Sequence, residues 1–289
     1  VQQELEARLV GSNVRIYPLH GNLTPEEQDR AVAPPEPGVR KVVLATSIAE
    51  TSLTVEGVRI VVDSGWSRIP RYSPRTGLTR LDTVRVSLAA AEQRRGRAGR
   101  LAPGVCYRLW RPEEERQFPD EHPPEILASD LSALALELAV WGTRDPAELA
   151  WLDPPPQAAY AQAVQLLQTL GALDEQGAVT AHGRAVAALG APPRLAHMML
   201  HSRAYGWEEP ACLLAALLQE RDFAEGPAQA QADLRPRLEA LAALRAGRGG
   251  AVQAAGSGGT FAINRPRARR IVELADRLHA MLCGAADGP

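Results

Sequence analysis

The feature that most constrains this chain is a change of pattern near residue 111. Before it, three short apolar runs rich in β-branched residues lie at residues 14–19, 41–45 and 58–63. Such runs are typical of buried parallel strands, which are joined by crossover connections. After residue 111, apolar residues recur at helical spacing instead. The pattern predicts an α/β domain with a parallel sheet, followed by a helical region.

A β-hairpin is predicted late in the α/β part. Within residues 66–86, two strand-like runs flank the sequence SPRTG at residues 73–77, which has strong turn chemistry. A short helix is expected near residues 89–99 and a last strand at residues 105–110.

The helical region is expected to contain a winged helix. Leucines at helical spacing predict a helix that Pro124 opens and Gly142 ends. A helix at residues 157–170, a short two-stranded element around Gly177 and a new helix start at Thr180 resemble a winged-helix module. Four or five further helices are expected after it.

The charge of the chain is distributed unevenly, although the formal net charge is only −2. Lys41 is the single lysine, and between Arg59 and Arg111 the chain has 12 arginines against three acidic residues. Between Pro112 and Tyr160, 11 acidic residues stand against two arginines. This asymmetry predicts that the arginine-rich segment binds anions.

Composition excludes two classes of protein. No apolar run reaches the roughly 18 residues of a transmembrane helix, so no membrane partner is expected. Cys106, Cys212 and Cys283 lie far apart, which argues against a disulfide scaffold and against a cysteine zinc site. Reduced cysteines fit a cytoplasmic location, which we expect for this chain.

Three segments carry the chemistry of the α/β part. They read YPLHGNLTPEEQDR at residues 17–30, ATSIAETSLTVEG at residues 45–57 and AAAEQRRGRAGR at residues 89–100. The third combines arginines, which bind phosphate in bidentate fashion, with glycines, which allow close approach to the backbone. Gln93, Arg97 and Arg100 follow at i, i+4 and i+7, on one face of a helix. The alternative is a generic basic loop that contacts nucleic acid or solvent.

Together, these segments resemble the second RecA-like domain of superfamily 2 helicases of the DEAH-box class, and in particular the bacterial HrpB-type ATP-dependent helicases. Residues 45–57 are similar to motif V, with Ser47 where asparagine is common. Residues 93–100 are similar to motif VI, QRxGRxGR, with Arg95 at the variable place. The hairpin between these motifs and the helical pattern after them also resemble that class.

The resemblance implies the fold and the domain boundaries. We expect a RecA-like α/β domain at residues 1–111, with a parallel sheet, helices on both faces and a β-hairpin. A winged-helix domain would follow at residues 112–190 and an α-helical bundle at residues 191–289.

The resemblance also implies roles for individual residues toward ATP. Gln93 would help to place the attacking water, and Arg97 and Arg100 would stabilise transition-state charge as arginine fingers. Three residues would lie near the water and the nucleoside: Ser52, Thr54 and Glu56. Aspartate is more usual at the last of these positions.

Nucleic-acid contacts are implied at four positions. Thr46 and Ser47 would donate hydroxyl hydrogen bonds to backbone phosphates. Arg71 and Arg75 flank the hairpin tip, where they would guide a single strand; an edge hairpin whose charges prevent sheet association is the alternative. The expected partner is single-stranded nucleic acid, with RNA preferred over DNA.

The sequence has no phosphate loop of the form G-x-x-x-x-G-K-[ST], because Lys41 lies in a predicted strand. It also has no Asp-Glu-x-His stretch to hold magnesium. ATP and its magnesium ion would therefore require a first RecA-like domain of the same protein, and we expect the 289 residues alone not to hydrolyse ATP. The rival hypothesis is a non-catalytic nucleic-acid-binding module in which the winged helix makes the contacts.

Two other groups of residues have open interpretations. His197 and His201 are four residues apart, as zinc ligands can be, but the sequence shows no third ligand, so we expect no metal site. The arginines at positions 265, 267, 269 and 270 either line a nucleic-acid channel or form an exposed helix start.

Overall fold

The computed structural model describes residues 1–21, 23–50, 55–226, 231–247 and 261–284. They form two compact units, Val1–Ser129 and the residues from Asp130 onward, and each is described by itself. The predicted three-way division at residues 111 and 190 stays a prediction.

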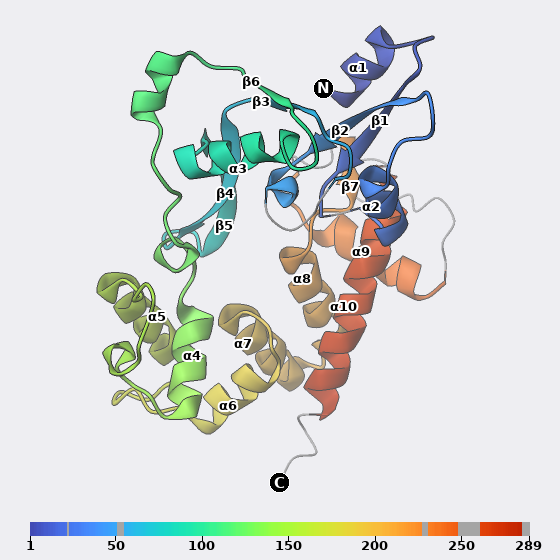
Figure 1. The fold of residues 1–289 in the computed structure, drawn as a ribbon. Helices are drawn as coiled ribbons and strands as arrows, with labels where there is room; N and C mark the ends of the chain where they lie inside the picture. Colours follow the sequence, from blue (N-terminus) through green and yellow to red (C-terminus); the bar gives the residue numbers. More distant parts are fainter. Residues whose placement is uncertain (22, 51–54, 227–230, 248–260, 285–289) are drawn as a thin grey trace. The chain divides into compact units, whose positions relative to one another are not determined.

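Two parallel strand pairs form the α/β part of the first unit (Figure 1). β1 (Val14–Leu19) pairs with β2 (Arg40–Ala45), and β3 (Ile60–Asp63) pairs with β6 (Val105–Arg108). The helices α1 (Gln2–Arg8) and α2 (Pro25–Val32) contact β1, whereas α3 (Leu88–Ala98) contacts β3 and β6. The predicted α/β class with parallel strands is confirmed.

Local sequence chemistry determines where α2 begins. The Thr24 hydroxyl accepts a hydrogen bond from the Glu27 backbone N–H at 3.3 Å, and the Glu27 carboxylate accepts one from the Thr24 N–H at 2.9 Å. This reciprocal arrangement is a capping box, and Pro25 occupies the first helical position.

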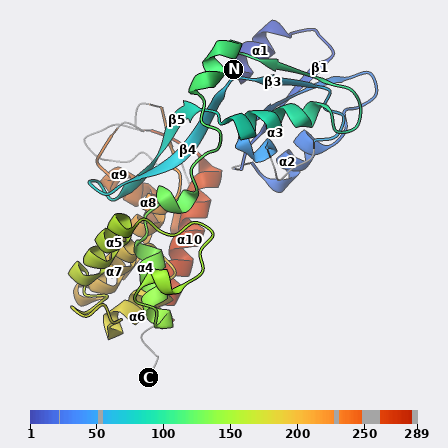
Figure 2. The ribbon, with the colours of Figure 1, turned by 60° about the vertical axis from the view of Figure 1, so that its left-hand side comes forward.

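The predicted hairpin is confirmed (Figure 2). β4 (Trp66–Ser73) and β5 (Leu78–Arg85) are antiparallel, with Ser73 opposite Leu78 at the turn. Gly77 has a φ of 67°, a conformation that favours glycine. The Tyr72 backbone N–H also donates a hydrogen bond to the Ala128 carbonyl at 2.9 Å.

A small core supports the first turns of α3. Val86, Ala90, Ala91 and Phe118 are buried together, and Trp110 packs against them. Because the alanine side chain is small, the helix can approach the strands closely. This packing fixes one face of α3 and leaves its polar face available.

Helices form most of the second unit. Their bounds are α4 (Ser132–Trp141), α5 (Gln157–Thr169), α6 (Ala181–Ala188), α7 (Pro193–Ser202), α8 (Glu208–Gln219), α9 (Arg235–Arg245) and α10 (Arg265–Gly284). Leu173 and Val179 form an isolated antiparallel bridge before α6, at the place expected for the wing. The long helix α10 packs along α8. No helix in the described ranges is long and apolar enough to cross a membrane.

Two features of this unit differ from the sequence prediction. The prediction that a helix begins at Pro124 is wrong. Residues 125–127 form one 3-10 turn, and α4 begins only at Ser132. The Asp130 carboxylate accepts a hydrogen bond from the Ser132 N–H at 2.9 Å, a local turn that competes with helix continuation. Gly142 ends α4 with a φ of 101°, as predicted. The pattern also missed the two-residue strands β7 (Ala224–Glu225) and β8 (Ala262–Ile263), which pair with each other.

Candidate functional site

The arginine-rich segment is presented by α3. The Ser87 hydroxyl caps this helix by accepting a hydrogen bond from the Ala90 N–H at 3.2 Å. Gln93 is exposed and Arg97 is half-buried, both on the helix, whereas exposed Arg100 lies two residues beyond its end. The predicted helix face therefore holds for Gln93 and Arg97, and Arg100 extends from the turn that follows.

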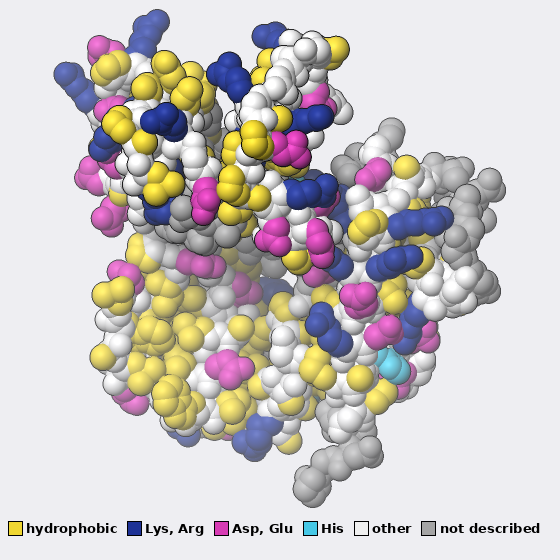
Figure 3. Space-filling model, turned by 45° about the vertical axis from the view of Figure 1, so that its right-hand side comes forward, with side chains coloured by type: hydrophobic (Ala, Val, Ile, Leu, Met, Phe, Trp, Pro, Cys, Tyr) yellow, Lys and Arg dark blue, Asp and Glu magenta, His cyan; other side chains and the backbone are white. Residues whose placement is uncertain are grey.

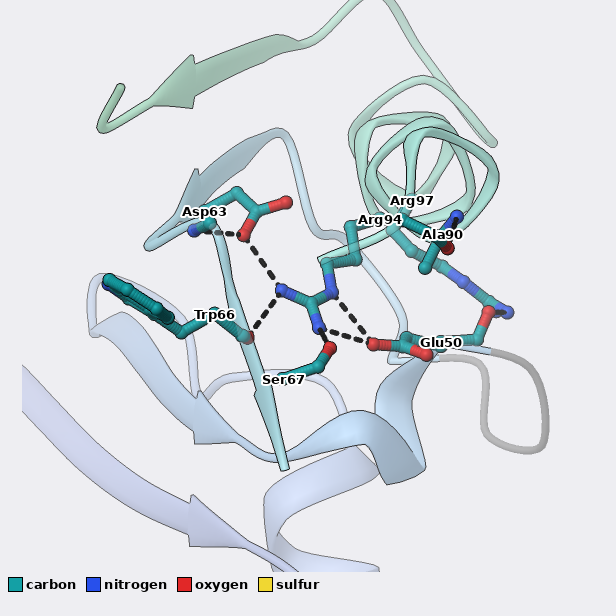
Figure 4. Close-up of polar contacts among 9 residues, drawn as sticks. Glu50, Asp63, Trp66, Ser67, Ala90, Arg94 and Arg97 are labelled. Atoms are coloured by element: carbon teal, nitrogen blue, oxygen red, sulfur yellow. Dashed lines mark hydrogen bonds and ion pairs between the residues drawn. The ribbon is translucent and has the colours of Figure 1, made fainter. Parts of the chain in front are cut away.

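Arg94, to which the sequence analysis assigned no role, forms a dense set of contacts (Figure 4). Its Nε and Nη2 lie 2.7 and 2.6 Å from Oε1 of Glu50, and its Nη1 lies 2.8 Å from Oδ1 of Asp63. It also donates to the Trp66 carbonyl at 3.2 Å and to the Ser67 hydroxyl at 2.8 Å. One guanidinium thus joins the end of β3, the start of β4 and the segment that follows β2.

This ion cluster is largely removed from water. The side chains of Arg94 and Glu50 are each 18% exposed, and that of Asp63 is 1% exposed. Burial alone would lower the pKa of Arg94, but the Glu50 hydrogen bond and the Asp63 charge outweigh it and raise the pKa. Arg94 is therefore a fixed cation that compensates the charge of a buried carboxylate, Asp63, and of a half-buried one, Glu50.

The Arg97 side chain contacts the backbone of the segment that contains Glu50. Its guanidinium donates a hydrogen bond to the Glu50 carbonyl oxygen. Burial lowers the pKa of Arg97, and the nearby positive charge of Arg100 lowers it further. Two neighbouring cations repel each other, and an anion placed against both would relieve that repulsion.

Two other predicted residues, Thr46 and Ser47, lie shortly before Glu50 in the sequence. Thr46 and Ser47 are exposed directly after β2 and begin the 3-10 turn η1 (Ser47–Ala49), which leads to Glu50. Carboxyl ends of parallel strands are the usual ligand-binding edge of such sheets. Glu56 is exposed, whereas Ser52 and Thr54 lie outside the described residues.

The hairpin arginines occupy two different environments. Nε of Arg71 lies 3.6 Å from Oδ2 of Asp82, and Nε of Arg80 lies 3.0 Å from Oδ1 of the same carboxylate. Arg75 lies in the exposed turn. Asp82 therefore compensates part of the charge near the tip, a pairing that the sequence pattern did not predict.

The structure brings a third histidine to His197 and His201. Nε2 of His182, on α6, lies 3.0 Å from Nδ1 of His197, and the ring centroids of His197 and His201 lie 4.5 Å apart. Within the part of the chain that the structure describes, no group of three His, Cys, Asp or Glu residues has a geometry that could hold a metal ion.

The basic cluster near residue 265 coincides with the start of α10, where the Asn264 side chain accepts a hydrogen bond from the Arg267 N–H at 3.2 Å. Figure 3 shows basic and acidic side chains interspersed over the visible face rather than one continuous basic field. The role of these arginines toward nucleic acid stays a prediction.

Known protein families match two parts of the chain. Residues 1–102 match the helicase conserved C-terminal domain, and residues 163–190 match the winged-helix helicase associated domain, HA2. The chain is 49% identical over 220 residues to the ATP-dependent RNA helicase HrpB of Escherichia coli K12, which covers 76% of this chain and 27% of that protein. It is 38% identical over 218 residues to the probable ATP-dependent RNA helicase DHX34 of Mus musculus, covering 75% and 19%.

Solved structures agree with these matches. Crystal structures described as the E. coli DExH-box NTPase HrpB and the E. coli DEAH/RHA helicase HrpB are each 41% identical to this chain. Their TM-scores are 0.71 and 0.77; both cover 96% of this chain, and the chain covers 31% and 32% of theirs. The chain thus spans less than a third of the length of these relatives.

Proposed function

We propose that this chain, a homologue of the DEAH-box helicases that carries their helicase C-terminal domain and associated winged helix, is the C-terminal part of an ATP-dependent RNA helicase. The observation that supports this most directly is the placement of Arg97 and Arg100. Arg97 lies on α3 and Arg100 two residues beyond its end, and the Arg97 guanidinium donates a hydrogen bond to the Glu50 carbonyl oxygen in the segment that follows β2.

The residues present fit the phosphates of ATP but not its magnesium ion. Arg97 and Arg100 supply fixed positive charge, and exposed Gln93 supplies a neutral group that can orient water. The carboxylates beside this helix, Glu50 and Asp63, are both engaged by Arg94. The sequence also has no Asp-Glu-x-His stretch, so in this proposal magnesium would be held by the first RecA-like domain.

The proposed mechanism assigns each residue one task. ATP would lie between two RecA-like lobes, of which this chain provides one. Arg97 and Arg100 would stabilise the charge that develops on the transferring phosphoryl group, and Gln93 would orient the attacking water. Ser52, Thr54 and Glu56 would lie toward the water and the nucleoside.

Single-stranded RNA is the proposed partner. Thr46 and Ser47 are exposed at the end of β2, where their hydroxyls can donate to phosphates. Arg71 and Arg75 would contact the strand beside the hairpin, because both side chains are exposed. A non-catalytic nucleic-acid-binding module is the alternative, and it predicts RNA binding without any role for Arg97.

The test is to measure ATP turnover by the full-length helicase that contains this chain, with the substitution Arg97→Ala. We expect kcat for ATP to fall by about 10³ or more, because an arginine finger acts on transition-state charge. RNA affinity should change little. Arg95→Ala is the matched control, since Arg95 is 59% exposed and pairs with Glu92 on the same helix. Near-normal turnover in Arg97→Ala would contradict the finger assignment.

A further inference from the structure

The geometry points to Arg94 as a positioning residue that couples nucleic-acid binding to ATP turnover. It would do so by holding the segment from Thr46 to Glu50 against the arginine finger Arg97. This inference rests on the proposed function and adds a residue and a route that the motif roles above do not include.

The segment that Arg94 holds is short and internally bonded. The Ala49 N–H donates to the Thr46 carbonyl at 3.2 Å, and the Glu50 N–H donates to the Ser47 carbonyl at 2.9 Å. The exposed hydroxyls of Thr46 and Ser47 therefore belong to the same turn as Glu50. These two hydrogen bonds provide a path from Thr46 and Ser47 to Glu50.

Glu50 has two separate contacts with α3. Its carboxylate accepts from Arg94, and its backbone carbonyl accepts from Arg97. Arg94 and Arg97 are three residues apart, and residues at this spacing are neighbours on a helix surface. Glu50 thus connects the two arginines, because Arg94 holds its carboxylate and Arg97 contacts its backbone carbonyl.

The Nη1 side of the Arg94 guanidinium contacts the end of β3 and the start of β4. Nη1 contacts the Asp63 carboxylate and the Trp66 carbonyl, so the guanidinium is held from a second side. Oδ1 of Asp63 accepts hydrogen bonds from Arg94 and from the Gly65 N–H, whereas Oδ2 is buried without a hydrogen-bond partner among the described residues, and within that part of the chain Arg94 supplies the only opposite charge paired with this carboxylate. A lysine carries its charge on a single ammonium group and cannot reproduce the guanidinium contacts with both Glu50 and Asp63.

The test uses the full-length protein that carries this chain. Arg94→Lys, Glu50→Gln and the double variant are compared by ATP turnover with and without single-stranded RNA. We expect the ratio of RNA-stimulated to basal turnover to fall by about 5–150-fold in each single variant, the range of typical coupling between sites. The double variant should show no larger loss than the worse single variant, because both act through one contact. Arg95→Lys is the control, one position along the same helix, and should keep the ratio.

Several outcomes would overturn the inference. An unchanged ratio in Arg94→Lys and Glu50→Gln, even with lowered thermal stability, would leave Arg94 with a structural role only. Additive losses in the double variant would mean that the two residues act independently. If Arg94→Lys does not fold, Glu50→Gln still decides, because it leaves Arg94 paired with Asp63. Normal turnover in Arg97→Ala would instead contradict the proposed function, so the two failures are distinguishable.

Discussion

The arginines of this chain act in two ways that depend on their surroundings. The sequence predicts that the motif VI arginines bind anions, and the exposed or half-buried positions of Arg97 and Arg100 fit that prediction. Arg94 belongs to the same run but is held by internal carboxylates. Its partners Glu50 and Asp63 lie 44 and 31 residues away along the chain, so spacing alone could not assign them.

A buried arginine of the second unit gives a prediction about stability. Arg237 is 3% exposed, and its Nε and Nη2 lie 2.9 and 2.7 Å from Oδ2 of Asp222. Burial would raise the pKa of Asp222, but the Arg237 hydrogen bond lowers it on balance. Arg237→Met should lower the free energy of unfolding by about 3 kcal/mol, the lower end for breaking a buried pair, because Asp222 remains partly in water.

Urea unfolding of the 289-residue chain measures this loss. Arg235→Met is the matched control, because Arg235 pairs with Asp233 but is 82% exposed, and an exposed pair contributes about 0–1 kcal/mol. Equal losses in the two variants would show that burial does not set the importance of these pairs.

At the scale of elements, the sequence predicts what local chemistry determines. The hairpin turn and the helix start at Thr180 each depend on a few neighbouring residues, and both are present in the structure. The late start of α4 was missed because Asp130 competes for the backbone. The β7–β8 pair was missed because two-residue strands carry no periodic signal.

The contact between α6 and α7 yields a pH prediction. Burial lowers the pKa of His182 and His197 below the ordinary 6.5, and the charge of His201 lowers both further. Below pH 6.5 the unfolded chain therefore binds more protons than the folded chain, so stability falls as pH falls through that value. We expect the thermal midpoint to drop between pH 7.5 and pH 5.5.

The His182→Gln/His197→Gln variant tests this origin of the pH dependence. Its thermal midpoint should fall less over the same pH interval, because the two depressed groups are gone. His279→Gln on α10 is the control and should keep the dependence of the unsubstituted chain. Identical pH profiles for all three proteins would exclude the cluster as the cause.

At the scale of the whole molecule, the chain carries one half of the proposed ATP site. The motif patterns predicted the helicase C-terminal domain and winged helix, and the family matches confirm both. In the first unit, three groups that could contact ATP or magnesium are engaged within the fold. Nζ of Lys41, the single lysine, lies 3.1 Å from the Arg30 carbonyl at the end of α2 and is directed to that helix. Glu50 and Asp63 are neutralised by Arg94.

We therefore expect the purified 289-residue chain not to hydrolyse ATP. Phosphoryl transfer needs a cation on the β- and γ-phosphates and carboxylates for magnesium, and the single lysine and the carboxylates of Glu50 and Asp63 are engaged within the fold. Release of inorganic phosphate from ATP and magnesium measures this, with the Arg97→Ala/Arg100→Ala chain as the background control. Turnover above that background would mean that the chain builds a complete site of its own, because contaminating activity would be equal in both preparations. Turnover equal to the background, together with activity in the longer protein that Arg97→Ala abolishes, is the result expected if the two halves meet only across a lobe interface.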